Sequence, residues 1–461
     1  MAGSTGEAAG TVAPRRLPPA VRVDPDPGVL RTLLHGVYDL GWIAFALLGS
    51  PWLLWMSLRQ RGFGRMVVER LGRRLGRVPP RTRPRILVHG VSVGEVKAAQ
   101  SLVALLEERH PDYELVISAA TNTGLEVAGK LFPEKLRVRF PADLSFVVKR
   151  FLDRVDPALV ILVELEVWPN LLRLCNRQGR PVAVVNGRIT RDSHGRYRFF
   201  RLLPEFNRIS LYCVQSAEYA QRFAVLGVER ERIVVTGNVK FDGLRVGPVA
   251  VGEELERFAG GRPGQRVLVA GSTHEPEELL VARALASVAP DVRLVLVPRH
   301  PDRSADLIAR LGAAGIRAQS LTALRAGEPV DRSRPLVVDT IGELERVYSL
   351  ADLVFVGGSL IPHGGQNMLE PAAQGKAVLF GPHVENFDQE AALLLAAGAC
   401  RKVADERALA EELARLLPDE AVRTQMGAAG AAAVAAQRGA TRLTLAALEA
   451  LDQGAVLRPR A

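Results

Sequence analysis

The chain has 461 residues, which is too long for one ordinary hydrophobic core and suits two domains of about 150–200 residues each. With 48% hydrophobic and 24% charged residues it is globular, and its formal net charge is +10, concentrated near the N-terminus. The widely spaced Cys175, Cys213 and Cys400 exclude a disulfide framework and a cysteine-based zinc site, so we expect reduced, buried thiols.

The N-terminal region predicts a disordered tail followed by a membrane anchor. Residues 1–37 open with a stretch rich in Gly, Ala and Pro, which is typical of disorder. Residues 38–60 are predicted as the anchor, because Leu40–Leu58 carries no charge and contains Trp42, Trp52 and Trp55, a residue type that favours membrane interfaces. Gly49–Pro51 interrupts this run, so both a kinked span and a re-entrant hairpin fit.

A basic segment over 61–84 follows the anchor. Such a run attracts anionic headgroups at about 1 kcal/mol per residue, and it orients the rest of the chain toward the cytoplasm. Nucleic-acid binding is disfavoured, because the charge lies beside the apolar run and the remaining chain has no aromatic RNA-reading motif. Residues 59–85 hold one acid, Glu69, and ten arginines: Arg59, Arg61, Arg65, Arg70, Arg73, Arg74, Arg77, Arg81, Arg83 and Arg85.

From residue 85 onward short apolar runs alternate with amphipathic stretches, which predicts an α/β chain with parallel sheets covered by helices. The alternation fills 85–240, breaks in a glycine-rich stretch over 241–264, and restarts over 265–461. We therefore predict two doubly wound, Rossmann-like domains facing a cleft and joined by a linker. The predicted strands include RILVHG (85–90), ELVISAAT (114–121), ALVILVELE (158–166), RVLVAGST (266–273), DLVFVGGS (352–359) and AVLF (377–380).

Polar residues follow many of these strands, and ligands of such sheets bind outside the carboxyl ends of the strands. Glu95, just after the first strand, has two readings: an acid that stabilises a helix N-terminus, or a general base. The residues alone do not favour either interpretation of Glu95. The groups at strand ends include His89, Ser92, Gly94, Glu164, Glu166, Arg188, Ser272, Thr273, Arg299, His300, Gly342, Glu343 and Gly358.

Residues 363–382, HGGQNMLEPAAQGKAVLFGP, combine a glycine turn with a carboxylate. Glycines let a backbone approach a ligand closely, and a helix starting at Gln366 and Asn367 would attract phosphate. Glu370 would repel phosphate, so it must hold a different group.

The ordered motifs HGVSVGE, VELEVWPN, NGRIT, VTGNVKFD, GSTHEPEE, PRHPDR, DTIGEL, GGQNMLEP and HVENF resemble those of the membrane-associated 3-deoxy-D-manno-octulosonic acid (Kdo) transferases of lipopolysaccharide synthesis. The likeness runs from about residue 30 to 450. It departs at Gln366, Met368, Gly90 and Gly187, where the family often has His, Pro, Ser and Ala.

The resemblance implies a GT-B fold and inverting transfer of Kdo from CMP-Kdo to a lipid A precursor, without metal or other cofactor. It implies catalytic roles for Glu95, as base, and Glu166, and a single anchor in the inner membrane that faces anionic lipid with cytoplasmic catalytic domains. We assign acceptor binding to Ser92, Gly94, Arg188 and Lys240. Donor binding is assigned to Ser272, Thr273, Arg299, His300, Gly342, Glu343, Gly358, Gly365, Asn367 and Glu370, with Glu370 on the ribose hydroxyls.

Two alternatives remain: another GT-B membrane glycosyltransferase, and a nucleotide-sugar epimerase. An epimerase would have no need of the apolar and basic segments over residues 40–85. The number of Kdo units transferred has no signature in the sequence.

Overall fold

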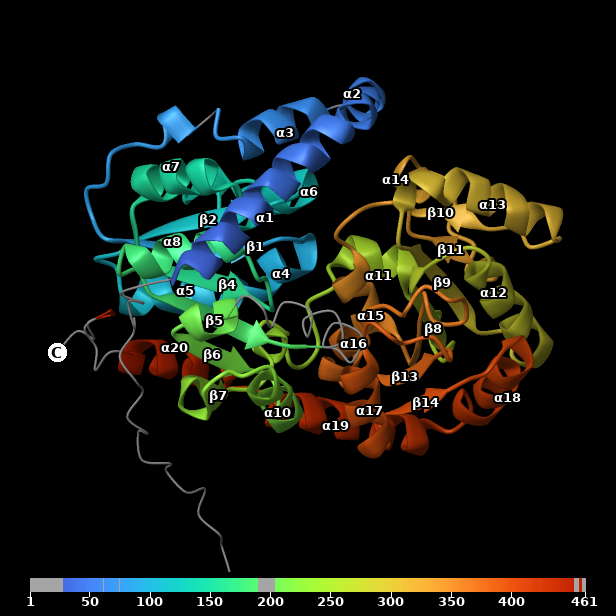
Figure 1. Cartoon of the computed structure of the whole chain (residues 1–461). Coiled ribbons are helices and arrows are strands. Elements are labelled where there is room, and N and C mark those ends of the chain that lie inside the picture. Colours follow the sequence, from blue (N-terminus) through green and yellow to red (C-terminus); the bar gives the residue numbers. More distant parts are fainter. Residues whose placement is uncertain (1–27, 61, 74, 190–203, 452–455, 458–461) are drawn as a thin grey trace, which may run out of the picture. The chain divides into compact units, whose positions relative to one another are not determined.

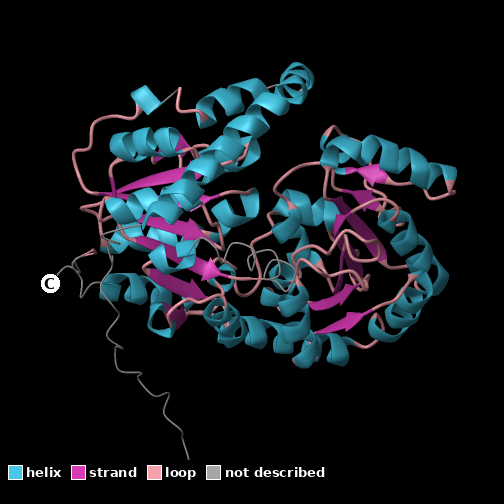
Figure 2. Cartoon of the chain, viewed as in Figure 1, coloured by secondary structure: helices cyan, strands magenta, loops and turns pink. Residues whose placement is uncertain are grey.

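The computed structural model describes residues 28–60, 62–73, 75–189, 204–451 and 456–457 (Figure 1). Within these ranges the chain forms two compact units, which we call unit 1 (to Gly243, and from Arg438 onward) and unit 2 (Leu244–Gln437). Each unit is a parallel sheet with helices, as its alternating sequence predicts (Figure 2).

Unit 1 is built on a seven-stranded sheet of order β3-β2-β1-β4-β5-β6-β7. The order reverses between β1 and β4, as in a doubly wound fold. The strands are β1 (Arg85–Gly90), β2 (Glu114–Ala119), β3 (Leu136–Arg139), β4 (Pro157–Val163), β5 (Val182–Gly187), β6 (Leu211–Val214) and β7 (Ile233–Val235). The helices are α1 (Gly28–Leu48), α2 (Ser50–Arg59), α3 (Phe63–Arg70), α4 (Val93–Ala98), α5 (Gln100–Arg109), α6 (Asn122–Leu131), α7 (Ser145–Val155), α8 (Pro169–Arg177), α10 (Ala217–Val225) and α20 (Ala440–Ala450), with 3-10 turns η1 (Leu75–Arg77), η3 (Pro204–Arg208), η4 (Arg230–Arg232) and η5 (Val239–Phe241).

Unit 2 repeats the plan with the order β10-β11-β9-β8-β12-β13-β14, which reverses between β8 and β12. Its strands are β8 (Val267–Thr273), β9 (Arg293–Pro298), β10 (Gln319–Ser320), β11 (Leu336–Val337), β12 (Leu353–Val356), β13 (Ala377–Phe380) and β14 (Cys400–Lys402). Its helices are α11 (Glu253–Ala259), α12 (Glu277–Val288), α13 (Ser304–Ala313), α14 (Leu321–Arg325), α15 (Leu344–Leu350), α16 (Leu369–Ala373), α17 (Asp388–Ala396), α18 (Glu406–Leu416) and α19 (Glu420–Ala436), with 3-10 turn η6 (Pro301–Arg303).

The central strands are buried on both faces, which explains their continuous apolar runs, whereas the short strands β3, β7 and β14 are partly exposed. In β1, for example, Ile86 and Val88 belong to one buried cluster and Leu87 to another, because successive side chains point to opposite faces of the sheet. The three cysteines are free and buried, as expected.

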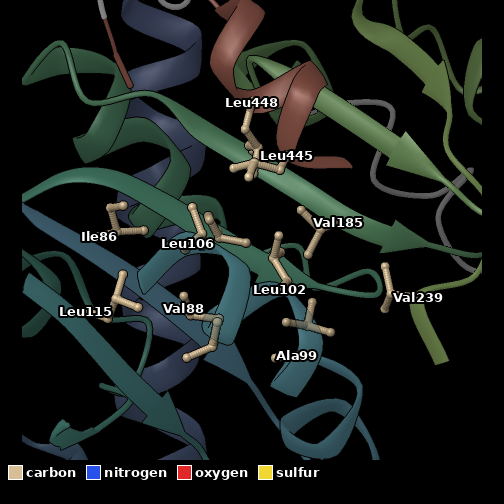
Figure 3. Close-up of a cluster of buried hydrophobic side chains, with 14 of the residues drawn as sticks. Ile86, Val88, Ala99, Leu102, Leu106, Leu115, Val185, Val239, Leu445 and Leu448 are labelled. Atoms are coloured by element: carbon tan, nitrogen blue, oxygen red, sulfur yellow. The ribbon is translucent and has the colours of Figure 1, made fainter. Parts of the chain in front are cut away.

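The last helix, α20, belongs to unit 1, although the predicted C-terminal domain (265–461) includes it. Leu445 and Leu448 pack into the same cluster as Leu102 and Leu106 of α5 (Figure 3). Asp242 accepts hydrogen bonds from the backbone N–H groups of Gly439 (2.6 Å) and Thr441 (2.5 Å) at the start of this helix. A helical pattern shows an apolar stripe but not its partner, so the sequence could not make this assignment.

Two other segments differ from their predicted ranges. Residues 28–37, placed by composition in a disordered tail over 1–37, form the first part of α1, where His35 is buried. Residues 1–27 lie outside the described residues. The predicted linker, 241–264, contains helix α11, whose Leu255 and Phe258 are buried.

The apolar N-terminal run is divided between α1 and α2. Gly49 separates them, and Pro51 lies in the first turn of α2, where it cannot donate a hydrogen bond back to α1. In the described part of the chain no one helix has the length and apolar character of a membrane span. Thr32–Leu48 and Ser50–Arg59, bent by 57°, meet that criterion only as a pair.

We expect Asp242→Ala to destabilise the protein by about 1–2 kcal/mol, the usual cost of losing a helix N-terminal cap. The free energy of unfolding would be measured by denaturant titration, with exposed Glu108→Ala as the control. Equal stability of the two variants would contradict the role of Asp242 in holding α20.

Candidate functional site

The strand-order reversal in unit 1 brings the ends of β1 and β4 together, since these two strands pair in parallel. Ligands of open α/β sheets bind at such a reversal. The loop after β1 leads to Glu95, and the loop after β4 carries Glu164 and Glu166. We call this group of carboxylates the acid cluster.

Glu95 lies in the first turn of α4, whose N-terminal cap is Ser92. Its carboxylate accepts hydrogen bonds from the Val91 N–H (2.6 Å) and the Ser92 hydroxyl (3.0 Å), while Ser92 Oγ accepts from the Glu95 N–H (3.4 Å). This reciprocal arrangement is close to a capping box, so the structural reading of Glu95 holds. It also fixes the carboxylate in one place, which a base requires. Gly94 is exposed beside it.

Burial and neighbouring acids raise the pKa values of this cluster. For Glu95 the pKa is raised first by burial and then by Glu164, against the opposing hydrogen bonds. For Glu166 burial, Glu95 and Glu164 raise the pKa to about 7, and Arg70 opposes them. Carboxylates with raised pKa values at a sheet edge can accept a proton near neutral pH.

Glu164 joins the two predicted acceptor-binding cations. Its carboxylate contacts Arg188 Nε at 3.2 Å and Lys240 Nζ at 2.9 Å. Arg188 follows β5 and Lys240 lies in η5, so one carboxylate links three loops at this edge. Glu164 has a φ of 64°, an uncommon conformation for a residue with a side chain and one that is concentrated at functional sites. The structure thus brings Glu95, Ser92, Glu164, Glu166, Arg188 and Lys240 to the same edge of unit 1.

Arg70 was missed as a site residue by sequence reasoning, because it lies in a run of arginines. Its Nε and Nη2 are buried without a hydrogen-bond partner, and its charge lowers the pKa of Glu166. The backbone carbonyl of Arg70 accepts a hydrogen bond from the Ala142 N–H, which holds the end of α3 beside the sheet.

In unit 2 Ser272 and Thr273 end β8, the strand predicted over 266–273, and they do not begin a helix, because α12 starts only at Glu277. Glu275 precedes a proline, which disfavours helical backbone at that position. Ser272 has a φ of 53°, and the buried Thr273 Oγ1 has no partner. Both residues remain at the strand reversal, beside β12.

A cluster of cationic and imidazole side chains surrounds the end of β8. The ring of His274 lies 4.0 Å from that of His363 and 5.8 Å from that of His300. Burial and then His363, His300, Arg303 and Arg299 lower the pKa of His274 to about 4, so it is neutral at pH 7. Arg299 and His300 are exposed. This arrangement suits a phosphate or carboxylate, and His274 and His363 were not among the predicted site residues.

The predicted donor residue Gly358 already has an anionic partner within the protein. The buried carboxylate of Glu277 accepts hydrogen bonds from the N–H groups of Gly358 (2.6 Å), Ser359 (2.9 Å), Leu360 (2.9 Å) and His274 (2.9 Å). These donors are therefore unavailable to a ligand while Glu277 holds them. Glu277 fixes the glycine turn to the end of β8, a role that the sequence could not separate from an ordinary helix-start acid.

The side chains of Asn367 and Glu370 are hydrogen-bonded to each other, but the two residues do not lie on one helix. Asn367 Nδ2 donates to Glu370 Oε1 at 3.0 Å, whereas α16 begins only at Leu369. The prediction that a helix starts at Gln366 and Asn367 is wrong. Gly365 has a φ of 81° and continues the turn, and the Asn367 side chain accepts from the Leu369 N–H.

Gly342 and Glu343 lie at the start of α15, where the Glu343 carboxylate contacts Arg325 (3.0 Å) and Arg346 (2.5 Å). This acid is thus engaged in ion pairs, and its donor-binding role stays a prediction. Over the residues that the structure describes, no cluster of three or more His, Cys, Asp or Glu side chains could hold a metal ion.

We expect Glu166→Gln to stabilise the protein more at pH 8 than at pH 5. When the pKa of a carboxyl is raised from 4.5 to about 7 in the folded state, the free energy of unfolding of the protein falls as pH rises between those values. The neutral amide of glutamine does not titrate, so the variant does not show this fall. Thermal unfolding midpoints across this range would test it, with exposed Glu108→Gln as control. A pH-independent difference from wild type would contradict the raised pKa.

Comparison with known proteins identifies the family. Residues 69–243 match the family described as 3-Deoxy-D-manno-octulosonic-acid transferase (kdotransferase). The 3-deoxy-D-manno-octulosonic acid transferase of Bordetella pertussis is 35% identical over 435 residues, covering 90% of this chain and 99% of its own length. The Haemophilus influenzae enzyme of the same name is 32% identical over 375 residues, covering 78% of this chain and 85% of its own length.

Solved structures show the same fold at low identity. A putative UDP-N-acetylglucosamine 2-epimerase from Listeria monocytogenes (15% identical, TM-score 0.55) covers 80% of this chain and 96% of its own. A glycosyltransferase from Rickettsia africae (12% identical, TM-score 0.53) covers 80% and 98%. These likenesses support the α/β GT-B fold. The sequence relatives, which cover 90% and 78% of this chain, place it in the Kdo transferase family of glycosyltransferases.

Proposed function

We propose that this Kdo transferase moves Kdo from CMP-Kdo to a lipid A precursor in lipopolysaccharide synthesis, with inversion of configuration and Glu95 as general base. The observation that carries the proposal is the half-buried Glu95 carboxylate at the β1–β4 reversal, with its pKa raised by burial and Glu164. A sugar hydroxyl is a poor nucleophile and needs such a base.

The reaction follows from these groups. The acceptor hydroxyl oxygen attacks the anomeric carbon of Kdo while the bond from that carbon to the CMP phosphate oxygen breaks. Glu95 takes the hydroxyl proton, and CMP leaves with the bonding electrons. Attack opposite the leaving group inverts the anomeric carbon. Ser92 and the Val91 N–H hold the Glu95 carboxylate during this step.

Unit 2 supplies the donor site in this proposal. Arg299 and His300 lie at the end of β8 and would bind the CMP phosphate without a metal ion, while Arg303 beside them is paired with the buried Glu278. Glu370, held by Asn367, would accept hydrogen bonds from the ribose hydroxyls. Phosphate groups of the acceptor would bind Arg188 and Lys240 at the edge of unit 1. These phosphates would compete with the Glu164 carboxylate, which pairs with both cations.

Glu95→Gln removes the base but keeps the shape and one acceptor oxygen. We expect transfer of labelled Kdo from CMP-Kdo to a purified lipid A precursor in detergent to fall at least about 100-fold. CMP-Kdo would still protect the variant against thermal unfolding. The control is Glu126→Gln, an exposed acid on the neighbouring α6. Transfer near the wild-type rate in Glu95→Gln would remove Glu95 from the mechanism.

We also propose that α1 and α2 attach the enzyme to the cytoplasmic face of the inner membrane. They expose large apolar side chains, among them Leu40, Phe45, Leu47, Leu48, Trp52, Leu54, Trp55 and Leu58. Arg59 stacks over Trp55 at 4.9 Å, which places a cation at the end of this apolar surface.

Flotation with vesicles that contain anionic phospholipid tests the attachment. We expect the full-length protein to float, and Trp52→Ser combined with Trp55→Ser to float less, because both rings are about half exposed (53% and 49%). Val225→Ser, an exposed apolar residue on α10, is the matched control. Failure of the wild-type protein to bind vesicles would exclude the proposed surface.

A further inference from the structure

Helix α1 is held to the rest of unit 1 by a partly buried polar network at Tyr38 and Asp39. Asp39 Oδ1 accepts hydrogen bonds from the Ser145 N–H (3.1 Å) and from Asn170 Nδ2 (2.7 Å), and its other oxygen accepts from the Ser145 hydroxyl. Tyr38 donates its hydroxyl to Asp143 Oδ2 at 3.1 Å. The first two residues of the predicted anchor, 38 and 39, are therefore hydrogen-bonded to other parts of unit 1.

The partners of α1 lie at the N-termini of α7 and α8. Asp143 accepts from the backbone N–H groups of Asn170 and Leu171, both at 3.0 Å, and so caps α8. Asn170 Nδ2 also donates to the Asp143 carbonyl at 2.7 Å. Asp143 and Asn170 are 1% and 0% exposed, so any group left without its bond here has no water to replace it. Arg173 Nη2 completes the network with bonds to Ser145 Oγ (2.8 Å) and Asn170 Oδ1 (3.1 Å).

The network meets the acid cluster through α8. The loop 164–168 runs from the end of β4 to Trp168, the N-terminal cap of α8, and it carries Glu164 and Glu166. Trp168 packs 5.2 Å from the ring of Phe140, which in turn stacks on His89 at the end of β1. Fixing the start of α8 therefore fixes the far end of this short loop.

We propose that Asp39 is a positioning residue of the transfer reaction: by bonding α1 to Asn170 and Ser145, it holds the 164–168 loop and its two carboxylates in their reactive position. The helix that we assign to membrane attachment is then also a part of the catalytic edge. This inference rests on the proposed function, because it assumes that the acid cluster performs the transfer.

The consequence for kinetics is specific. A displacement of about 1 Å in a catalytic group can lower a rate by roughly 100-fold. Loss of Asp39 would move the loop while leaving the apolar surface of α1 and α2, and the donor site in unit 2, unchanged. Turnover should fall, whereas vesicle binding and the KM for CMP-Kdo should not change.

The test compares Asp39→Ala with Val37→Ala in the full-length protein, using detergent-dispersed acceptor so that membrane attachment is not required. Val37 is a matched control because it lies on the same helix and is 64% exposed. We expect kcat to fall about 10- to 100-fold in Asp39→Ala only, with unchanged flotation. Asp39→Asn, which keeps an acceptor oxygen, should recover part of the loss.

A double-mutant cycle separates positioning from general damage. If Asp39 acts through the 164–168 loop, Asp39→Ala should lower kcat much less in a Glu166→Gln background than in wild type. Additive losses would overturn the proposal, as would a kcat for Asp39→Ala equal to that of Val37→Ala. If Asp39→Ala does not fold, the two single variants Tyr38→Phe and Asp39→Asn replace it. A wild-type kcat in both of these single variants would overturn the proposal.

The proposed function fails in a different way. If the wild-type protein transfers no Kdo, or Glu95→Gln keeps its activity, the assigned reaction or base is wrong. If Glu95→Gln is inactive while Asp39→Ala behaves like its control, the positioning role of Asp39 alone is wrong.

Discussion

The reversal of strand order in each parallel sheet is the constraint on which the chemistry depends. Neighbouring strands β1 and β4 in unit 1, and β8 and β12 in unit 2, send their following loops away from each other, and polar residues gather at these strand ends. Glu95 and Glu166 in unit 1, and His274 and Arg299 in unit 2, owe their positions to this topology.

The two edges have opposite electrostatic character. Unit 1 gathers carboxylates whose mutual repulsion and burial raise their pKa values, which prepares one of them to take a proton. Unit 2 gathers arginines and histidines, which suits a phosphate leaving group. Among described residues other than glycine, Glu164, Asn186 and Ser272 have positive φ values at these edges. Strained backbone at such positions is stabilised by the surrounding sheet.

The N-terminal helices are integrated into unit 1. Glu69 of α3 pairs with Arg139 at the end of β3 (3.2 Å), and both side chains are almost fully buried. Together with the Asp39 network, this pair connects the proposed membrane-facing segment to the same sheet edge as the acid cluster. Under the proposed function such rigidity would be useful, because the orientation of the proposed membrane-attachment helices would also fix the position of the 164–168 loop.

The sequence by itself determined the fold class, the family and most strands. β1 spans 85–90 as predicted, because a buried parallel strand is a continuous apolar run bounded by polar residues. The sequence did not predict short edge strands such as β10 and β14, because strands of two or three residues are too short to show a periodic pattern. The ordered motifs also predicted Glu95, Glu166 and Lys240 as site residues, and the structure brings these three residues to one edge of unit 1.

Only the tertiary structure decided which groups meet. It showed that Glu277, and not a ligand, holds the Gly358 N–H, that Asn367 lies before its helix, and that α20 packs on unit 1. It also joined Asp39 to Asn170, 131 positions away. Local patterns record propensity and burial, but hydrogen bonds between distant segments depend on how the sheet and its helices pack, which no short stretch of sequence contains.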